Sequence, residues 1–245
     1  MKKYKKIFCV IIALLIIFFV VFFLRKEDNY ILKGELKNCK ECDLYLVERF
    51  EGIETVLDTI HANKNGKFKI ERKAQDPTIL TLRGKNDAIL LLPMQKEKIK
   101  ITADYENLAT TYQISGSEES LRLKTLNDKK IKARFALKNM SEQLKETSQE
   151  DYDSVRNVIQ QRFNLLMQSQ REFLIGFINT NVGSLSTLVA LYDSDLENIH
   201  LIDPIKDKDV YEKVLSGLKD KYPENKNTKF LEHEVLRLRQ ITTGK

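Results

Sequence analysis

The sequence of 245 residues contains no tryptophan, only three cysteines, four prolines and nine glycines. The absence of tryptophan excludes every motif that requires one, including the Trp-Cys-x-x-Cys active site of thioredoxin-like domains. The small numbers of glycine and proline exclude collagen-like and loop-dominated architectures. With 42% apolar and 31% charged residues, the composition is typical of a globular protein.

An excess of one charge is also lacking over most of the chain. There are 41 Lys and Arg residues against 35 Asp and Glu residues, a formal net charge of +6. Six of the basic residues lie in positions 1–26, where no acidic residue occurs, so 35 basic and 35 acidic residues remain in 27–245. Because this remainder is neutral, the composition predicts no nucleic-acid partner.

One long apolar run is present. Residues 7–24 are eighteen apolar residues, which as a helix would span about 27 Å, close to the hydrocarbon thickness of a bilayer. Basic residues flank both ends, and four of them precede the run. We therefore expect a single-pass signal-anchor in a bacterial inner membrane, with a cytoplasmic tail over 1–6, a linker over 25–29 and residues 27–245 in the periplasm. The alternative is a cleaved signal peptide and secretion to the periplasm, although no small-x-small cleavage site follows the run.

Residues 30–116 alternate between apolar and polar positions with period two. Seven or eight short strands without intervening helices predict an antiparallel β-sandwich or barrel. Asn65-Gly66 is the strongest hairpin signal, and it leads into Phe68 and Ile70 on one face. The expected strands are 30–36, 43–49, 54–60, 67–71, 78–83, 88–92, 98–103 and 111–115.

A helical period replaces this alternation over 117–245. Two heptad-like apolar series run over 123–144 and 155–177. When the first series is matched in reverse order to the second, the residue numbers of each pair add up to nearly the same value. This relation predicts an antiparallel helical hairpin with its turn near 147–150. The same register places Lys130 opposite Gln170 as a polar layer that fixes the register or lets Lys130 reach water, with a ligand contact as the alternative. Short capping helices are expected at 184–192, 207–221 and 228–239. The predicted class is therefore α+β: a transmembrane helix, an antiparallel β domain over 30–116 and a helical domain over 117–245.

Cys39 and Cys42 form the one conspicuous constellation of reactive residues. As zinc ligands they would be half a site, because a structural site needs four ligands. As a redox pair they should begin a helix, whereas they lie between two expected strands with the acidic Glu41 between them. The remaining interpretation is a structural disulfide or a pair of spectator thiols, and an oxidising compartment favours the disulfide.

Known catalytic motifs are absent from the sequence: no GxSxG, P-loop, GxGxxG or HExxH occurs. His61, His200 and His233 do not form a paired ligand motif. We therefore predict no catalytic residues, no metal and no cofactor.

Three segments carry a resemblance to a known family. Residues 57–70, 91–104 and 112–117 are similar to the hairpin, strand pair and Gly-Ser junction of an uncharacterised bacterial envelope domain that commonly precedes an AhpC/TSA or TlpA-like thioredoxin domain. The likeness spans roughly 30–240 and implies a β-sandwich followed by helices. The thioredoxin domain that carries the redox cysteines of those proteins has no counterpart here, so Cys39 and Cys42 do not match them.

The resemblance and the missing Trp predict a membrane-anchored, non-catalytic binding module that lacks the catalytic half of such oxidoreductases. Its expected partners are the membrane through residues 7–24 and a protein or ligand in the envelope, of which a thioredoxin-like protein is one example. The alternative is a part in thiol–disulfide exchange, either through Cys39 and Cys42 or by supporting a separate thioredoxin-like protein. A third hypothesis is a stress or envelope-assembly factor without a redox role.

Overall fold

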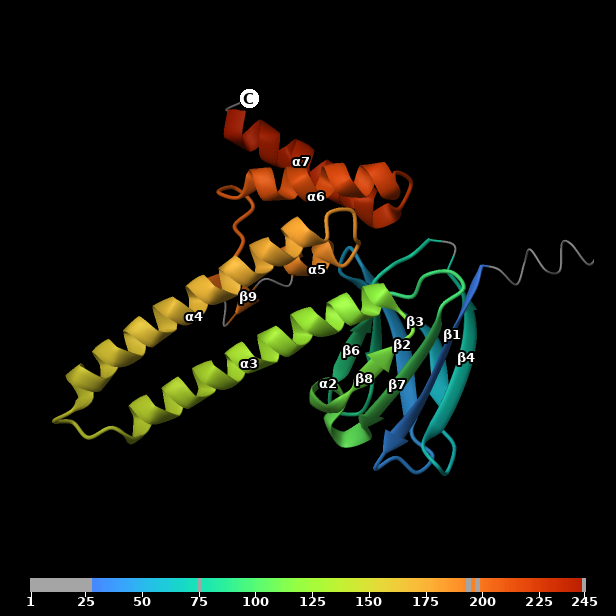
Figure 1. Ribbon diagram of the computed structural model, residues 1–245, viewed down its shortest axis with the longest axis horizontal. Helices are drawn as coiled ribbons and strands as arrows, with labels where there is room; N and C mark the ends of the chain where they lie inside the picture. Colours follow the sequence, from blue (N-terminus) through green and yellow to red (C-terminus); the bar gives the residue numbers. More distant parts are fainter. Residues whose placement is uncertain (1–27, 75, 193–194, 197–198, 244–245) are drawn as a thin grey trace, which may run out of the picture.

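The computed structural model describes residues 28–74, 76–192, 195–196 and 199–243. These residues form two four-stranded sheets, one two-stranded sheet and six α-helices (Figure 1). The sheets lie at one end of the molecule, and a long pair of helices projects from them. The fold is α+β. It differs from the prediction in the direction of one strand pair, in which strands pair with each other, and in the predicted transmembrane helix.

The first sheet contains a parallel pair and is not antiparallel throughout as predicted. Its order is β4-β1-β7-β8, in which β1 pairs antiparallel with β4 and parallel with β7. Alternation identifies a strand but carries no direction, and β1 and β7 are separated by the whole second sheet, so the sequence pattern could not reveal this pairing. The strands are β1 (Asn29–Lys37), β4 (Lys67–Lys73), β7 (Lys98–Asp104) and β8 (Gln113–Ser115).

The second sheet is antiparallel throughout, with the order β3-β2-β5-β6. Its edge strand β6 has no polar residue because both of its faces are covered. Ile89 and Leu91 point into the core between the sheets, while Leu90 packs against the helices. The strands are β2 (Asp43–Phe50), β3 (Ile53–His61), β5 (Leu80–Arg83) and β6 (Ala88–Leu91).

Asn65 and Gly66 form a turn but not the predicted hairpin. The turn connects β3 to β4, and these strands pair with β2 and β1 in different sheets. Asn63 Oδ1 accepts hydrogen bonds from the backbone N–H groups of Asn65 and Lys67, at 2.9 and 3.0 Å. An Asn-Gly signal therefore marks a tight reversal here, but it does not determine which strands pair across it.

The helices lie on the outer face of the second sheet and extend beyond it. In the structure α3 (Glu118–Glu146) and α4 (Tyr152–Thr180) form a long antiparallel pair, whose far end projects away from the sheets (Figure 1). Between residues 134 and 169 no side chain is buried. We call this projecting part the arm. The remaining elements are the 3₁₀ turn η1 (Tyr105–Asn107), α2 (Leu108–Thr111), α5 (Thr187–Tyr192), β9 (Asp195–Leu196), β10 (Ile199–His200), α6 (Lys208–Lys221) and α7 (Lys226–Thr243).

The first turn of α3 anchors the helical part to the second sheet. Ser117 caps the helix by accepting a hydrogen bond from Ser120 N, and Ser120 Oγ accepts one from Leu92 N at 3.0 Å. Glu119, only 5% exposed, accepts a hydrogen bond from Ser184 Oγ in the connection between α4 and α5. Because these buried polar groups are satisfied by one another, they fix the start of α3 against both the sheet and α5.

The predicted membrane segment requires a correction. No helix in the described part of the chain is long and apolar enough to cross a bilayer, and residues 7–24 lie outside that part. The expected tail over 1–6 and residues 25–27 of the expected linker over 25–29 also lie outside the described part, as does the segment to which the signal-peptide alternative refers. Among the described residues there is therefore no transmembrane helix, and the structure does not support the single-pass inner-membrane placement that was expected.

Candidate ligand-binding groove

A groove of about 640 Å³ lies where helices cover the outer face of the second sheet. This volume is within the range of about 300–1,000 Å³ that is usual for sites of small organic ligands. Its walls come from β2 and the β2–β3 turn, β5, β6, α3, α5 and α7. The described lining residues are Arg49, Phe50, Glu51, Thr78, Ile79, Thr81, Leu90, Asn127, Lys130, Arg134, Leu188, Val189, Tyr192, Asn227 and Phe230.

The end of β2 that lines the groove closes in a tight turn. The β2–β3 register shifts between Leu46 and Val47 because β3 carries one extra residue, Leu57, opposite this step, whereas β2 pairs with β5 without a break. A two-residue turn then joins Phe50 to its partner Ile53. Glu51 and Gly52, the residues of this turn, both have positive φ, at 49° and 80°, as in the tight hairpins that suit the strand twist.

One face of α3 forms the opposite wall. Asn127, Lys130 and Arg134 are three and four residues apart, so they lie along one side of the helix. From α5, Leu188 and Val189 supply apolar surface and Tyr192 supplies an aromatic ring. The groove is therefore apolar on the α5 side and basic on the α3 side.

Three aromatic rings connect the sheet to the C-terminal helix at the groove. Phe230 in α7 contacts Phe50 and Tyr192 edge-on, with ring centroids 6.1 and 6.2 Å away. Lys226 Nζ lies 5.0 Å from the centre of the Phe50 ring and pairs with Glu48 at 2.5 Å. Edge-on aromatic pairs and such cation contacts stabilise beyond simple burial, so this cluster holds α7 against the end of β2.

The start of α7 is fixed by amide side chains. Asn225 Nδ2 donates to Asp76 Oδ1 at 2.5 Å and to the Pro77 carbonyl at 2.7 Å, and Asn227 Nδ2 donates to Thr78 Oγ1 at 3.3 Å. The side-chain N–H groups of Asn225 and Asn227 beside the groove thus donate to other residues of the protein. The polar groups at this end therefore position α7, and the groove surface beside them is left to the apolar side chains.

The Tyr192 hydroxyl also has a partner in α7. It donates a hydrogen bond to Glu234 Oε2 at 2.7 Å. The Tyr192 pKa is raised, although 43% of the residue is exposed. The larger cause is removal of the hydroxyl end from water, and the smaller cause is the bond to Glu234. The phenol therefore stays protonated, and Tyr192 presents its ring rather than its hydroxyl to the groove.

The groove has an excess of positive charge. Arg49 and Arg134 are both exposed, and within the described residues neither guanidinium group makes an ion pair or a hydrogen bond. Glu51 is the one acidic side chain among the described lining residues, against Arg49, Lys130 and Arg134. Two guanidinium groups on facing walls, β2 and α3, are therefore available to a bound anion.

Lys130 and Gln170 line a second, smaller cavity of about 50 Å³ behind the groove. Leu90, Asn127, Lys130 and Val189 line both spaces, so the two adjoin. Gln170 is only 7% exposed. The structure thus brings the two predicted residues to one cavity where the hairpin meets the sheet, and their role in fixing the register stays a prediction.

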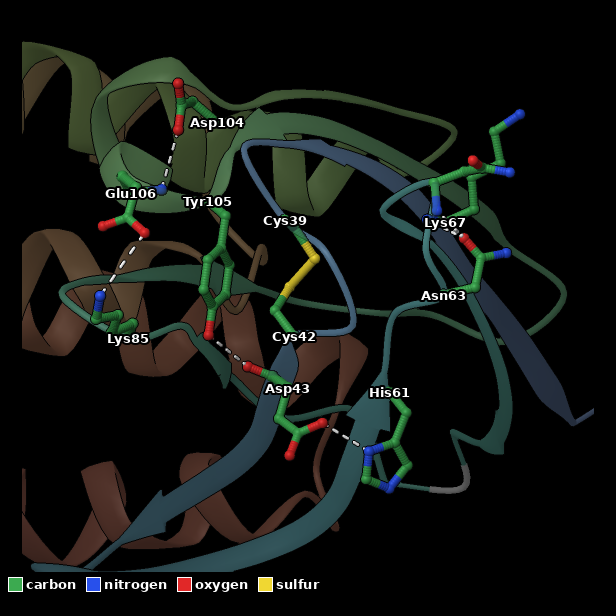
Figure 2. The surroundings of a disulfide bond; sticks show 11 residues. Cys39, Cys42, Asp43, His61, Asn63, Lys67, Lys85, Asp104, Tyr105 and Glu106 are labelled. Atoms are coloured by element: carbon green, nitrogen blue, oxygen red, sulfur yellow. Dashed lines mark hydrogen bonds and ion pairs between the residues drawn. A yellow bond between two sulfur atoms is a disulfide. The ribbon is translucent and has the colours of Figure 1, made fainter.

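The disulfide forms a separate site at the other end of β2 (Figure 2). Cys39 and Cys42 are bonded with their Cα atoms 5.5 Å apart, in the connection between β1 and β2. Cys39 is 6% exposed and belongs to the core between the sheets. Phe50 is seven residues beyond the start of β2, which places the disulfide roughly 23 Å from the groove at about 3.3 Å per residue.

Side chains of neighbouring elements hold the disulfide connection in place. The Tyr105 hydroxyl donates to the Asp43 carbonyl at 2.9 Å, and Asp43 Oδ1 lies 2.6 Å from His61 Nδ1 (Figure 2). Asn38 Nδ2 donates to Asp104 Oδ2 at 2.7 Å. Across the described ranges no three His, Cys, Asp or Glu side chains are grouped as metal ligands would be. The arrangement therefore secures a short loop.

The groove residues were not identified from the sequence. Apart from Lys130, the sequence singles out no lining residue, because these residues come from six segments that are far apart in the chain. One local signal was present: Glu51-Gly52 lies between two alternating runs, and a glycine there is typical of a two-residue hairpin turn. Recognising that turn would have paired β2 with β3, although not with α7.

Comparison with known proteins gives one match. Residues 30–123 match the model of a family described as a domain of unknown function, DUF4369. No curated protein and no solved structure matches the chain. The matched region covers both four-stranded sheets and the first turns of α3, and it ends well before the limit of the predicted resemblance, near residue 240. The chain therefore contains a region similar to an uncharacterised domain, and the match ends before α5 and α7, which complete the groove.

Proposed function

We propose that the protein is a non-catalytic binding module and that the groove is its ligand site. The single observation that carries the proposal is a space of about 640 Å³ with an apolar, aromatic wall between the sheet and the helices. Phe50, Tyr192 and Phe230 would form the contact surface for the ligand. A concave apolar site with a few polar groups is the usual form of a small-molecule site.

The alternative, thiol–disulfide exchange, receives less support. The sulfur of an exchanging cysteine must be reached by an attacking thiolate, whereas Cys39 is packed in the core between the sheets. The pair lies in a connection between strands rather than at the start of a helix, where the helix dipole would lower a thiol pKa. A structural disulfide accounts for both features, and the matched family carries no assigned activity.

The natural absence of tryptophan makes the proposal directly testable. Phe230→Trp places a single fluorophore in the groove wall, and Tyr152→Trp places one at the far end of the arm as a matched control. Titration with the neutral apolar dye N-phenyl-1-naphthylamine should give saturable energy transfer from the groove tryptophan. Equal transfer from both variants, or none from either, would remove the support for a groove ligand.

A further inference from the structure

We infer that the groove ligand is an organic anion, an acidic group joined to an apolar body, rather than a neutral or cationic compound. This inference rests on the proposed function and adds the chemical class of the ligand. It starts from the available volume. At about 30 Å³ for each water molecule, the groove corresponds to roughly twenty waters, so a free phosphate or acetate would leave most of it filled with solvent. The ligand must therefore carry a body of considerable size.

The walls define the chemistry of that body. Phe50 and Phe230 meet edge-on at 6.1 Å, and Leu188 and Val189 continue the apolar surface from α5. Asn227 is engaged with Thr78, so it adds little capacity for new hydrogen bonds. A polar body such as a sugar would lose hydrogen bonds to water against such walls without regaining them, whereas an acyl chain or a ring would gain from burial.

Charge then selects the head group. Arg49 from β2 and Arg134 from α3 are exposed guanidinium groups on different walls, and neither has an acidic partner among the described residues. A guanidinium group binds a carboxylate through two parallel hydrogen bonds. A cationic head group would be repelled by both arginines and would find only Glu51, so an acid is favoured over an amine of the same length.

The shape of the site favours a monomeric small molecule over a lipid surface. The apolar residues line a hollow between elements, so a ligand must enter the space to contact them. A flat membrane surface could reach the two arginines but not the ring of Phe230 at the same time. We therefore commit to a free amphipathic acid, and anionic vesicles serve as the contrasting probe.

Three probes of equal chain length and different head group test the inference on the full chain: decanoate, decanol and decyltrimethylammonium. Calorimetric titration below their micellar concentrations should show decanoate binding at least about tenfold more tightly than decanol, and the cation most weakly, because a charge-assisted hydrogen bond is worth about 1.5–3 kcal/mol and 1.4 kcal/mol is a factor of ten. The preference for decanoate should decrease with added salt, because exposed charges are screened.

Arg134→Gln should weaken decanoate binding about five- to tenfold and leave decanol unchanged. Arg156→Gln, a change of an exposed arginine on the arm, is the matched control and should change neither.

Equal binding of decanoate and decanol, unaffected by Arg134→Gln, would overturn the inference while the groove remained a ligand site. Failure of all three probes, together with no energy transfer to the dye from the fluorophore of Phe230→Trp, would overturn the proposed function as well. Binding to phosphatidylglycerol vesicles without binding of decanoate would assign the arginines to a lipid surface and overturn the choice of a free acid.

Discussion

Phe50 and Phe230 are 180 positions apart in the chain, yet their rings meet edge-on with centroids 6.1 Å apart. One ring closes the β2–β3 hairpin and the other lies in the second turn of α7. Their contact joins the region that matches the uncharacterised domain to the last helix of the chain, and the groove lies beside it. The groove therefore depends on the C-terminal helix as much as on the sheet.

Truncation of the ring in α7 tests this dependence. Because Phe230 is half-buried, Phe230→Ala should lower the free energy of unfolding by about 1–2 kcal/mol, less than for a fully buried phenylalanine, and should weaken decanol and decanoate alike. Urea denaturation and calorimetric titration measure the two effects. Phe135→Ala removes a ring that is 65% exposed and should change stability by less than about 0.5 kcal/mol. Similar effects from both variants would show that the aromatic cluster does not hold α7 in place.

Replacing both cysteines tests whether the disulfide is structural. Cys39→Ala combined with Cys42→Ala should lower the free energy of unfolding by about 2 kcal/mol, as expected for a very short disulfide loop, and should leave ligand affinity unchanged. The wild-type protein should show the same loss of stability after reduction and no turnover in an insulin-reduction assay. Measurable turnover that disappears in the double variant would restore the exchange hypothesis.

A glycine is required at position 66 because of its backbone. Gly66 has φ +70°, and a Cβ atom there would lie 2.0 Å from the Leu36 carbonyl oxygen. Gly66→Ala should therefore destabilise the protein by at least about 2 kcal/mol, through left-handed strain and displacement of β1. Gly176→Ala is the matched control: this helical glycine has open space around it, so the same change should stabilise by about 0.5–1 kcal/mol. Thermal denaturation of both variants gives the comparison, and a neutral Gly66→Ala would contradict the tight approach of the turn to β1.

Acid should weaken the ion pair that attaches helix α4 to the segment preceding α6. Arg171 donates hydrogen bonds to Asp207 from both terminal guanidinium nitrogens, Nη2 at 2.5 Å and Nη1 at 2.8 Å, and this pairing lowers the Asp207 pKa. A lowered folded-state pKa contributes stability above the ordinary aspartate pKa of about 3.9, and that contribution is lost as the pH falls through the lower, folded value. Asp207→Asn should thus cost about 2 kcal/mol at pH 7 and progressively less toward pH 3. Asp153→Asn, an exposed change on the arm, should leave the pH dependence unaltered. A pH-independent loss in Asp207→Asn would show that the pair acts through packing alone.

The sequence was a good guide to where strands and helices lie, but not to how they associate. Alternation placed the strand that became β2 over 43–49, against Asp43–Phe50 in the structure, because the pleat imposes period two on any half-buried strand. Pairing is non-local, so the Asn65-Gly66 signal predicts a hairpin, although its flanking strands enter different sheets. The same limit hid the parallel neighbour of β1.

The two candidate sites also differ in how far the sequence could predict them. Cys39 and Cys42 are three residues apart, so the sequence alone made their bond a reasonable expectation. The groove joins Arg49, Arg134 and Phe230 from three distant segments, and only the folded chain brings them together. Lys130 and Gln170 lie between these cases, because heptad spacing relates residues across a hairpin whose turn is known.

The most direct test of the groove as a ligand site is a titration of the ¹⁵N-labelled full chain with decanoate, followed by amide chemical shifts. We expect saturable shifts confined to the turn at Glu51, to α5 around Val189 and to α7 around Phe230. The amides beside the Cys39–Cys42 disulfide, roughly 23 Å away along β2, should not move. Shifts centred on the disulfide or on the far end of the arm, with none at Phe230, would contradict the assignment of the groove as the binding site.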